Sequence, residues 1–186
     1  MRDPDRGTGG RAGRKPGFWK FDMHVHTTYS GDSVNDPAAV VRSYRKTNVL
    51  PLVCDHNTTA GSVVVYYGIR QQDPGIPAIA AEEVMTAEGE VIGLFLTEEI
   101  PPYLPAAETV DLIHDQGGLV LVPMAERLPV GTAARLASAL DQGEVGFERD
   151  GSSQRWPCRI GVVAFDEGTS EDAPLPGALS DRLAFH

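Results

Sequence analysis

Two short segments of the chain contain side chains suited to bind a metal ion. The first runs from Asp22 to Thr27 with the sequence DMHVHT, and the second from Cys54 to Asn57 with the sequence CDHN. Together they hold three of the chain's five histidines and two aspartates. Imidazole nitrogens bind divalent cations readily, and carboxylate oxygens can complete such sites. The chemistry that this combination indicates is hydrolysis by a water molecule that a metal ion activates.

The first segment ends a predicted strand over residues 18–25. Side chains two residues apart point to the same face of a strand, so Asp22, His24 and His26 would lie side by side. A single His-x-His pattern is weak by itself. Its position strengthens it, because α/β folds place their active sites at the carboxyl ends of the strands.

The second segment ends a predicted strand over Val49–Cys54. Asp55 and His56 can both reach a site there if the chain is already turning into a loop. The alternative is that Asp55 caps the next helix and His56 lies on the surface. Asn57 or Thr58 could cap that helix equally well, which would leave Asp55 and His56 free. Cys54 itself is predicted to pack in the core and not to act as a nucleophile.

Acidic residues near a predicted third strand, Ile76–Val84, could extend this site. Glu82-Glu83 ends this strand, and a carboxylate there could bridge two metal ions, as carboxylates do in two-metal sites; the alternative is a solvated acidic pair. Asp32 lies in the loop after the first strand and could reach the same pocket, although its position is also typical of a turn. His114 lies in a predicted helix and is expected to be structural or exposed.

Strands and helices are predicted to alternate around these residues. Asp36 followed by Pro37 is typical of a helix start, and the apolar spacing continues this helix to about Lys46. The other elements predicted before Pro123 are a helix over 58–70, a strand over 91–96 after a hairpin turn at Glu88-Gly89, a helix over 105–116 with Val110 and Ile113 facing inward, and a strand over 119–122. This alternation predicts an α/β sheet or barrel with crossover helices.

The pattern weakens after Pro123. One helix is predicted over residues 132–140 and one strand over 155–165, while 166–180 has the composition of a loop or a disordered segment. We therefore expect three regions: a disordered basic leader over 1–17, a folded domain over 18–123, and a divergent, partly disordered C-terminal region over 124–186.

Charge is distributed unevenly along the chain. Residues 1–20 carry six basic and two acidic side chains, and the rest carries 10 basic and 24 acidic ones. So acidic a region is a poor nonspecific binder of nucleic acid. The leader could contact RNA or DNA, but its composition favours an unstructured segment. No apolar run approaches the ~20 residues that span a membrane, no secretory signal is visible, and a reduced cytoplasmic setting is expected.

Four motifs in this order resemble the polymerase and histidinol phosphatase (PHP) family. They are DMHVHT at 22–27, SGD at 30–32, DHN at 55–57 and EEVMT at 82–86. The stretch that continues through EVIGLFLTEEIP at 90–101 to QGGLV at 116–120 is similar to a bacterial branch of PHP metal-dependent phosphoesterases. The resemblance covers roughly residues 18–123, and four motifs at matching spacing make it specific.

The resemblance implies a distorted β/α barrel, seven-stranded in the complete family domain, with metal ions at the carboxyl ends of the strands. By motif, His24 and His26 would bind one metal ion, and Glu83 would bridge to a neighbouring ion held by Asp32 and His56. The residues expected to take part in catalysis are Asp22, Asp55 and Glu83. The metal implied is manganese, zinc, iron or magnesium. The reaction implied is hydrolysis of a phosphoester in a phosphorylated small molecule, a nucleotide or a short oligonucleotide.

The chain departs from the family in two places. The family has a metal-binding His in a Pro-His-Pro segment after its fifth strand, where this chain has Pro123-Met124-Ala125. A thioether is a poor ligand for the cations expected. The family's late Gly-Ser-Asp-x-His motif supplies two more ligands, but Ser180-Asp181 stands at the wrong spacing from His186. Changes around the ligands of a metal site already lower metal affinity or activity ~10–100-fold. The loss of three direct ligands should lower them further, so the metal site is expected to be incomplete, with at least one ion bound weakly or absent. The fold class expected is α/β, a partial (β/α)7 barrel of PHP type that is incomplete at its C-terminal end.

Both departures begin just after Pro123, and a frameshift that makes residues 124–186 incidental is one hypothesis for them. Two functions stay open. One is a PHP phosphoesterase, a hydrolase by descent with an impaired site. The other is a non-catalytic PHP remnant that binds metal or phosphate. An amidohydrolase of the same barrel type is a distant third, which the EEVMT motif argues against. An unfinished sheet edge also predicts a homo-oligomer.

Overall fold

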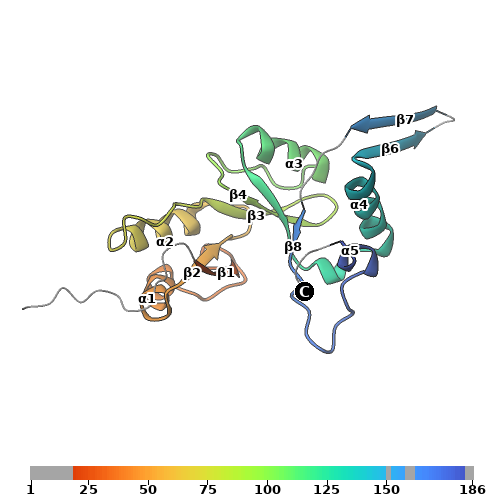
Figure 1. Ribbon diagram of the computed structural model, residues 1–186. Helices are drawn as coiled ribbons and strands as arrows, with labels where there is room; N and C mark the ends of the chain where they lie inside the picture. The colour runs from red at the N-terminus through yellow and green to blue at the C-terminus, as the bar shows by residue number, and fades with distance from the viewer. Residues whose placement is uncertain (1–18, 150–151, 158–161, 183–186) are drawn as a thin grey trace, which may run out of the picture.

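The computed structural model describes residues 19–149, 152–157 and 162–182 of the chain (Figure 1). The leader expected over residues 1–17 lies outside these ranges. The elements before Pro123 are β1 (Lys20–Val25), α1 (Pro37–Thr47), β2 (Val49–Val53), α2 (Ala60–Arg70), β3 (Ala81–Met85), β4 (Glu90–Leu94), α3 (Ala106–Asp115) and β5 (Leu119–Val122). After it come a 3-10 turn η1 (Ala125–Arg127), α4 (Val130–Gln142), β6 (Glu144–Arg149), β7 (Ser152–Pro157), β8 (Val163–Ala164) and α5 (Gly177–Ser180).

Strands β1 and β2 form a parallel pair, and helix α1 is the crossover that connects them. Asp36 caps this helix as predicted, because its carboxylate accepts hydrogen bonds from the backbone N–H groups of Ala38 at 2.7 Å and Ala39 at 3.1 Å. Pro37 occupies the first turn, where its missing N–H costs nothing. The helix buries Val41 and Tyr44 and so covers one face of the pair.

The second sheet has the order β3-β4-β5-β8 and mixes both kinds of pairing. β3 and β5 both run antiparallel to β4, whereas β8 runs parallel to β5. A single bridge between His56 and Glu83 joins the end of β2 to β3. There the Glu83 N–H donates to the Asp55 carbonyl at 3.1 Å, and the Asn57 N–H donates to the Glu83 carbonyl at 2.9 Å. The carboxyl end of β2 and the middle of β3 are thereby held together.

The main core lies between α1, α2 and the strands of both sheets. Its largest fully buried side chains include Leu50, Leu52, Tyr66 and Ile69. Helix α2 forms although its run of valines favours a strand by propensity, because Val65, Tyr66 and Ile69 fall on one buried face. Burial of an apolar helical face outweighs a propensity difference of a few tenths of a kcal/mol per residue.

Most elements predicted before Pro123 are confirmed, including the β3–β4 hairpin. The third strand is shorter than predicted, since β3 begins only at Ala81. In α3, Ile113 is fully buried, as predicted. Val110 was also predicted to face inward, but it is only half-buried, and Thr109 is buried in its place.

The predicted single strand over residues 155–165 is wrong. Its first part belongs to β7, which pairs with β6, and its last part contains β8, which pairs with β5 in another sheet. The run of β-prone residues was continuous, but pairing with two different partners divides it. The loop expected over 166–180 is confirmed up to Pro176, where the short helix α5 follows.

The fold is therefore α/β with mixed sheets. The strands within the described ranges form open sheets, of which the β6–β7 hairpin is a separate one; Figure 1 shows this hairpin projecting beyond α4. No helix in the described part of the chain is long and apolar enough to cross a membrane.

Candidate metal centre

Four side chains from the ends of β1 and β2 and from the middle of β3 converge on one point. The Glu83 carboxylate is at its centre: Glu83 Oε2 lies 3.0 Å from His26 Nε2, 3.3 Å from His24 Nε2 and 3.4 Å from His56 Nδ1. The two Nε2 atoms of His24 and His26 are 2.9 Å apart. Parallel β1 and β2 deliver the histidines to one edge, and the bridge from β2 to β3 brings Glu83 to them.

The Glu83 carboxylate is held ionised at this point. Its side chain is only 1% exposed, and burial alone would raise its pKa. Hydrogen bonds from His24 and His26, together with the charges of His24 and His56, outweigh that cost and lower the pKa of Glu83 to about 2. The cluster thus combines one buried anion with three imidazoles that are 14–26% exposed.

His24 and His26 face each other through their Nε2 atoms, which are within hydrogen-bonding distance. Hydrogen bonding to the Cys54 sulfur and the Glu83 carboxylate raises the pKa of His24 to about 11 and that of His26 to about 10. At 2.9 Å one Nε2–H can donate to the other Nε2, provided that the accepting nitrogen carries a lone pair. Both nitrogens would present lone pairs if a cation were bound between them.

Two buried polar atoms of the cluster make no hydrogen bond within the described residues. They are Nδ1 of His56 and Oε1 of Glu83. Buried polar atoms normally have a partner, and a lone pair without one is costly. Both atoms belong to side chains of the cluster itself, so its set of ligand atoms fits a bound divalent cation. Among the described residues, His26, His56 and Glu83 form one group of ligand atoms within 4.8 Å of one another.

Cys54 forms a second such group with His24 and His26. Its side chain is fully buried and packs in the main core, as predicted. Its sulfur also lies within 4.8 Å of nitrogen atoms of both histidines, which was not predicted. The arrangement is a His/Cys/Glu cluster that could bind a metal ion, and the sulfur favours a softer cation than magnesium.

Asp32 lies at the open side of the cluster. Its carboxylate oxygens are 3.2 Å and 3.3 Å from His26 Nδ1, and one of them is 3.4 Å from His56 Nε2. The side chain is 53% exposed. Asp32 therefore contacts the histidines from the loop after β1.

Asp55 is fully buried beside the cluster, and its carboxylate accepts hydrogen bonds from the loop that follows β1. Its two carboxylate oxygens accept hydrogen bonds from Thr27 N at 2.6 Å, Thr27 Oγ1 at 2.7 Å and Ser30 Oγ at 3.0 Å. Ser30 Oγ in turn accepts the backbone N–H of His56 at 2.8 Å. Gly61 allows this close packing, because a Cβ there would lie 1.7 Å from Asp55 Oδ2. Asp55 thus orients the segments that carry His26 and His56.

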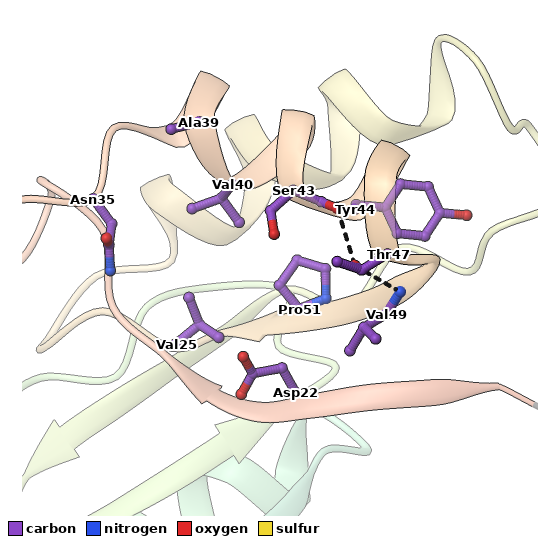
Figure 2. A pocket seen from close by; sticks show the side chains of 10 residues that line it. All are labelled: Asp22, Val25, Asn35, Ala39, Val40, Ser43, Tyr44, Thr47, Val49 and Pro51. Carbon is purple, nitrogen blue, oxygen red and sulfur yellow. Dashed lines mark hydrogen bonds between the residues drawn. The ribbon is translucent and has the colours of Figure 1, made fainter.

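Asp22 lies outside both ligand groups of the described residues, but it lines a cavity together with His24 and Glu167. The register of β1 is irregular between Asp22 and Val25, which disturbs the simple alternation on which the prediction rested. Asp22 is exposed and also lines a cavity of about 420 Å³ between α1 and the β1–β2 pair. Figure 2 shows its carboxylate together with Val25 and Pro51, which line the same cavity. Neither ligand group found among the described residues contains Asp22.

Two acidic residues near the cluster were not predicted. Glu167 Oε1 lies 2.8 Å from His24 Nδ1, and Glu90 Oε1 lies 3.8 Å from His56 Nδ1. A sequence signal for Glu167 existed, since Asp166-Glu167 follows an apolar run just as Asp55-His56 does. Met124, at the end of β5, belongs to neither ligand group of the described residues, and His114 is exposed on α3.

No protein-family model matches the chain. It is 37% identical over 115 residues to an uncharacterised protein of Methanocaldococcus jannaschii, an alignment that covers 56% of this chain and 66% of that protein. A second uncharacterised protein of the same organism is 38% identical over 104 residues, with 56% of this chain and 38% of the relative covered. A 5'-3' exoribonuclease of Haemophilus influenzae is 29% identical over 131 residues, with 68% and 47% covered. The chain therefore spans between 38% and 66% of these relatives.

Proposed function

We propose that the chain is a metal-dependent phosphoesterase of the PHP family. The observation that carries this proposal is the convergence of His24, His26 and His56 at 3.0–3.4 Å on one oxygen of the buried Glu83 carboxylate. The similarity to an exoribonuclease supports it, because that protein's name describes hydrolysis of a phosphodiester. Nucleotides and short oligonucleotides are therefore the preferred substrate class among phosphorylated compounds.

The proposed roles follow the positions of the side chains. His24, His26 and Glu83 would hold one cation, and His56 with Asp32 would hold a neighbouring one. Manganese, zinc or iron fits this imidazole-rich set better than magnesium, which prefers oxygen ligands. A bound cation would lower the pKa of a water molecule and withdraw charge from a phosphoryl oxygen. Glu83 would bridge, and its buried charge would fix the cations against the strand ends.

The proposed catalytic residues differ in what supports them. Three hydrogen bonds occupy Asp55, so we assign it a positioning role for His26 and His56 in place of direct catalysis. A catalytic role for Asp22 stays a prediction. In domain terms, residues 18–123 would form the PHP-like part, with β1–β5 as the first strands of the distorted barrel. Residues 124–186 would form the divergent region.

A second candidate is a PHP remnant that binds a metal ion or phosphate without turnover. Met124 favours this alternative, because it stands at the end of β5 where the family's ligand His is expected.

The outer edge of β1 has no strand paired with it among the described residues, which supports the proposal of a homo-oligomer. A stable monomer in light scattering would count against that association.

The test compares metal binding and turnover in the full chain. Stripped protein is titrated with zinc or manganese in a calorimeter and then assayed on a generic phosphodiester. His26→Ala should weaken binding by more than about 100-fold, beyond the effect of outer-shell changes, and should abolish turnover. His114→Ala is the matched control and should change neither. Binding with turnover supports the phosphoesterase, binding without turnover supports the remnant, and absence of binding contradicts both.

A further inference from the structure

The far nitrogen of His24 is held by a carboxylate from the divergent region. Glu167 Oε1 lies 2.8 Å from His24 Nδ1, which is a strong hydrogen bond by its length. The His24 side chain is 19% exposed and that of Glu167 31%, so solvent screens the contact only in part. A carboxylate offers only acceptors when it is ionised, and therefore the hydrogen of this bond lies on Nδ1.

This hydrogen position determines what His24 offers to the cluster. A neutral imidazole with its hydrogen on Nδ1 has a lone pair on Nε2. Nε2 is the atom that lies 2.9 Å from His26 Nε2 and 3.3 Å from Glu83 Oε2. A lone pair directed at this point is what a cation requires, and a carboxylate on the other nitrogen also increases the basicity of the imidazole.

The backbone that carries Glu167 is attached to the four-stranded sheet β3-β4-β5-β8. The Glu167 N–H donates to Glu126 Oε2 at 3.1 Å, and the Glu126 side chain is almost fully buried. Phe165 exchanges backbone hydrogen bonds with the end of β5 and the turn after it: its N–H donates to the Val122 carbonyl at 2.9 Å, and its carbonyl accepts from the Ala125 N–H at 2.7 Å. Phe165 also packs against the main core. The carboxylate is therefore placed by sheet pairing.

We propose that Glu167 is a positioning residue that holds His24 in the tautomer and orientation needed to bind a cation. The inference rests on the proposed metal site and deepens it, because it makes residues after Pro123 part of the site. It also argues against the hypothesis that residues 124–186 are incidental, because Glu167 presents its carboxylate to His24 from the loop after the paired strand β8.

The test measures zinc affinity of the full chain in three variants. Glu167→Ala should weaken zinc binding by about 10–100-fold, as outer-shell losses do. Glu167→Gln should have a smaller effect, because its amide oxygen still accepts from Nδ1 but carries no charge. Glu171→Gln changes an exposed glutamate of the same loop and should leave the affinity unchanged. Circular dichroism checks that each variant is folded, and the isosteric Gln variant carries the test if the Ala variant is not.

A spectroscopic readout separates positioning from general stabilisation. In the zinc-loaded protein, the Nδ1–H of His24 should give a slowly exchanging proton signal in NMR spectra with labelled histidine. The signal should shift in Glu167→Gln, disappear in Glu167→Ala and stay in Glu171→Gln. Unchanged affinity and signal in Glu167→Ala would overturn the inference while the metal site stands. Absence of zinc binding by the unsubstituted chain would overturn both.

Discussion

The regions before and after Pro123 contribute to the molecule in different ways. Both ligand groups found among the described residues lie between His24 and Glu83, and they stand on strands that a large apolar core supports. After Pro123, the buried apolar side chains of the described residues are four alanines and one leucine. Burial stabilises in proportion to apolar area, so the second region gains much less from packing.

This difference indicates which part of the fold can tolerate changes in its sequence. The first region needs its exact strand ends, because three side chains meet Glu83 within 3.4 Å. The second region reaches the site through the two-residue strand β8 and the loop after it, which the buried Glu126 side chain also holds. A region with few large buried side chains can change its sequence while these attachments keep Glu167 in place.

Hydrogen exchange should show the largest contrast between the two regions. The β6–β7 hairpin pairs only with itself in the described part of the chain, and isolated two-stranded hairpins are marginal in water. Its amides should open with a free energy near zero, whereas those of β3 and β4 should approach the global stability, about 5–15 kcal/mol. Strand β8 is the internal reference and should fall between them. Equal protection of β4 and β6 would remove the contrast.

The next largest effect is expected at Asp55 in the first region. Asp55→Ala leaves three donors of Thr27 and Ser30 without their buried acceptor. The free energy of unfolding should fall by about 3–5 kcal/mol, because each buried donor that is left unsatisfied costs about 1–3 kcal/mol. Chemical denaturation measures this, and Asp111→Ala, an exposed aspartate on α3, is the control. A loss below about 1 kcal/mol would show that the network contributes little.

The proximity of His24, His26 and His56 could be predicted from the sequence because its signals are local. The histidine segments follow apolar runs, and the period of a strand places them at strand ends. The separate roles of Asp55 and His56 were not predictable, since they depend on Thr27 and Ser30, which are distant in the chain. The position of Asp22 depends on an irregularity of β1 that no residue pattern indicated.

Glu167 was missed for a different physical reason. Its place depends on β8 pairing with β5, a contact between distant residues, and the apolar run before it was interpreted as one strand. A continuous β-prone run does not show where pairing partners change. The crossover fold before Pro123 was predictable because capping and turn residues mark each boundary there, as Asp36 does for α1.

Stability should depend on pH through Glu82, the neighbour of Glu83. Burial raises the pKa of Glu82 to about 7, against a hydrogen bond from the Ile100 N–H. The folded state thus keeps a proton that the unfolded state loses near pH 4.5, so this group's contribution to stability falls as pH rises towards 7. Between pH 5 and 8, the metal-free protein should lose about 2–3 kcal/mol that Glu82→Gln does not lose. Parallel pH profiles of the two proteins would contradict the assignment.

The smallest effect is expected from an ion pair of the second region. Arg182 donates to both carboxylate oxygens of Asp141, which joins α4 to the segment after α5. Both side chains are substantially exposed, and such pairs rarely contribute measurable stability. Asp141→Asn should therefore leave the melting temperature and the zinc affinity unchanged. A loss like that of Asp55→Ala would mean that α4 and α5 unfold together with the first region. The two regions would then form one cooperative unit, despite the difference in the side chains that they bury.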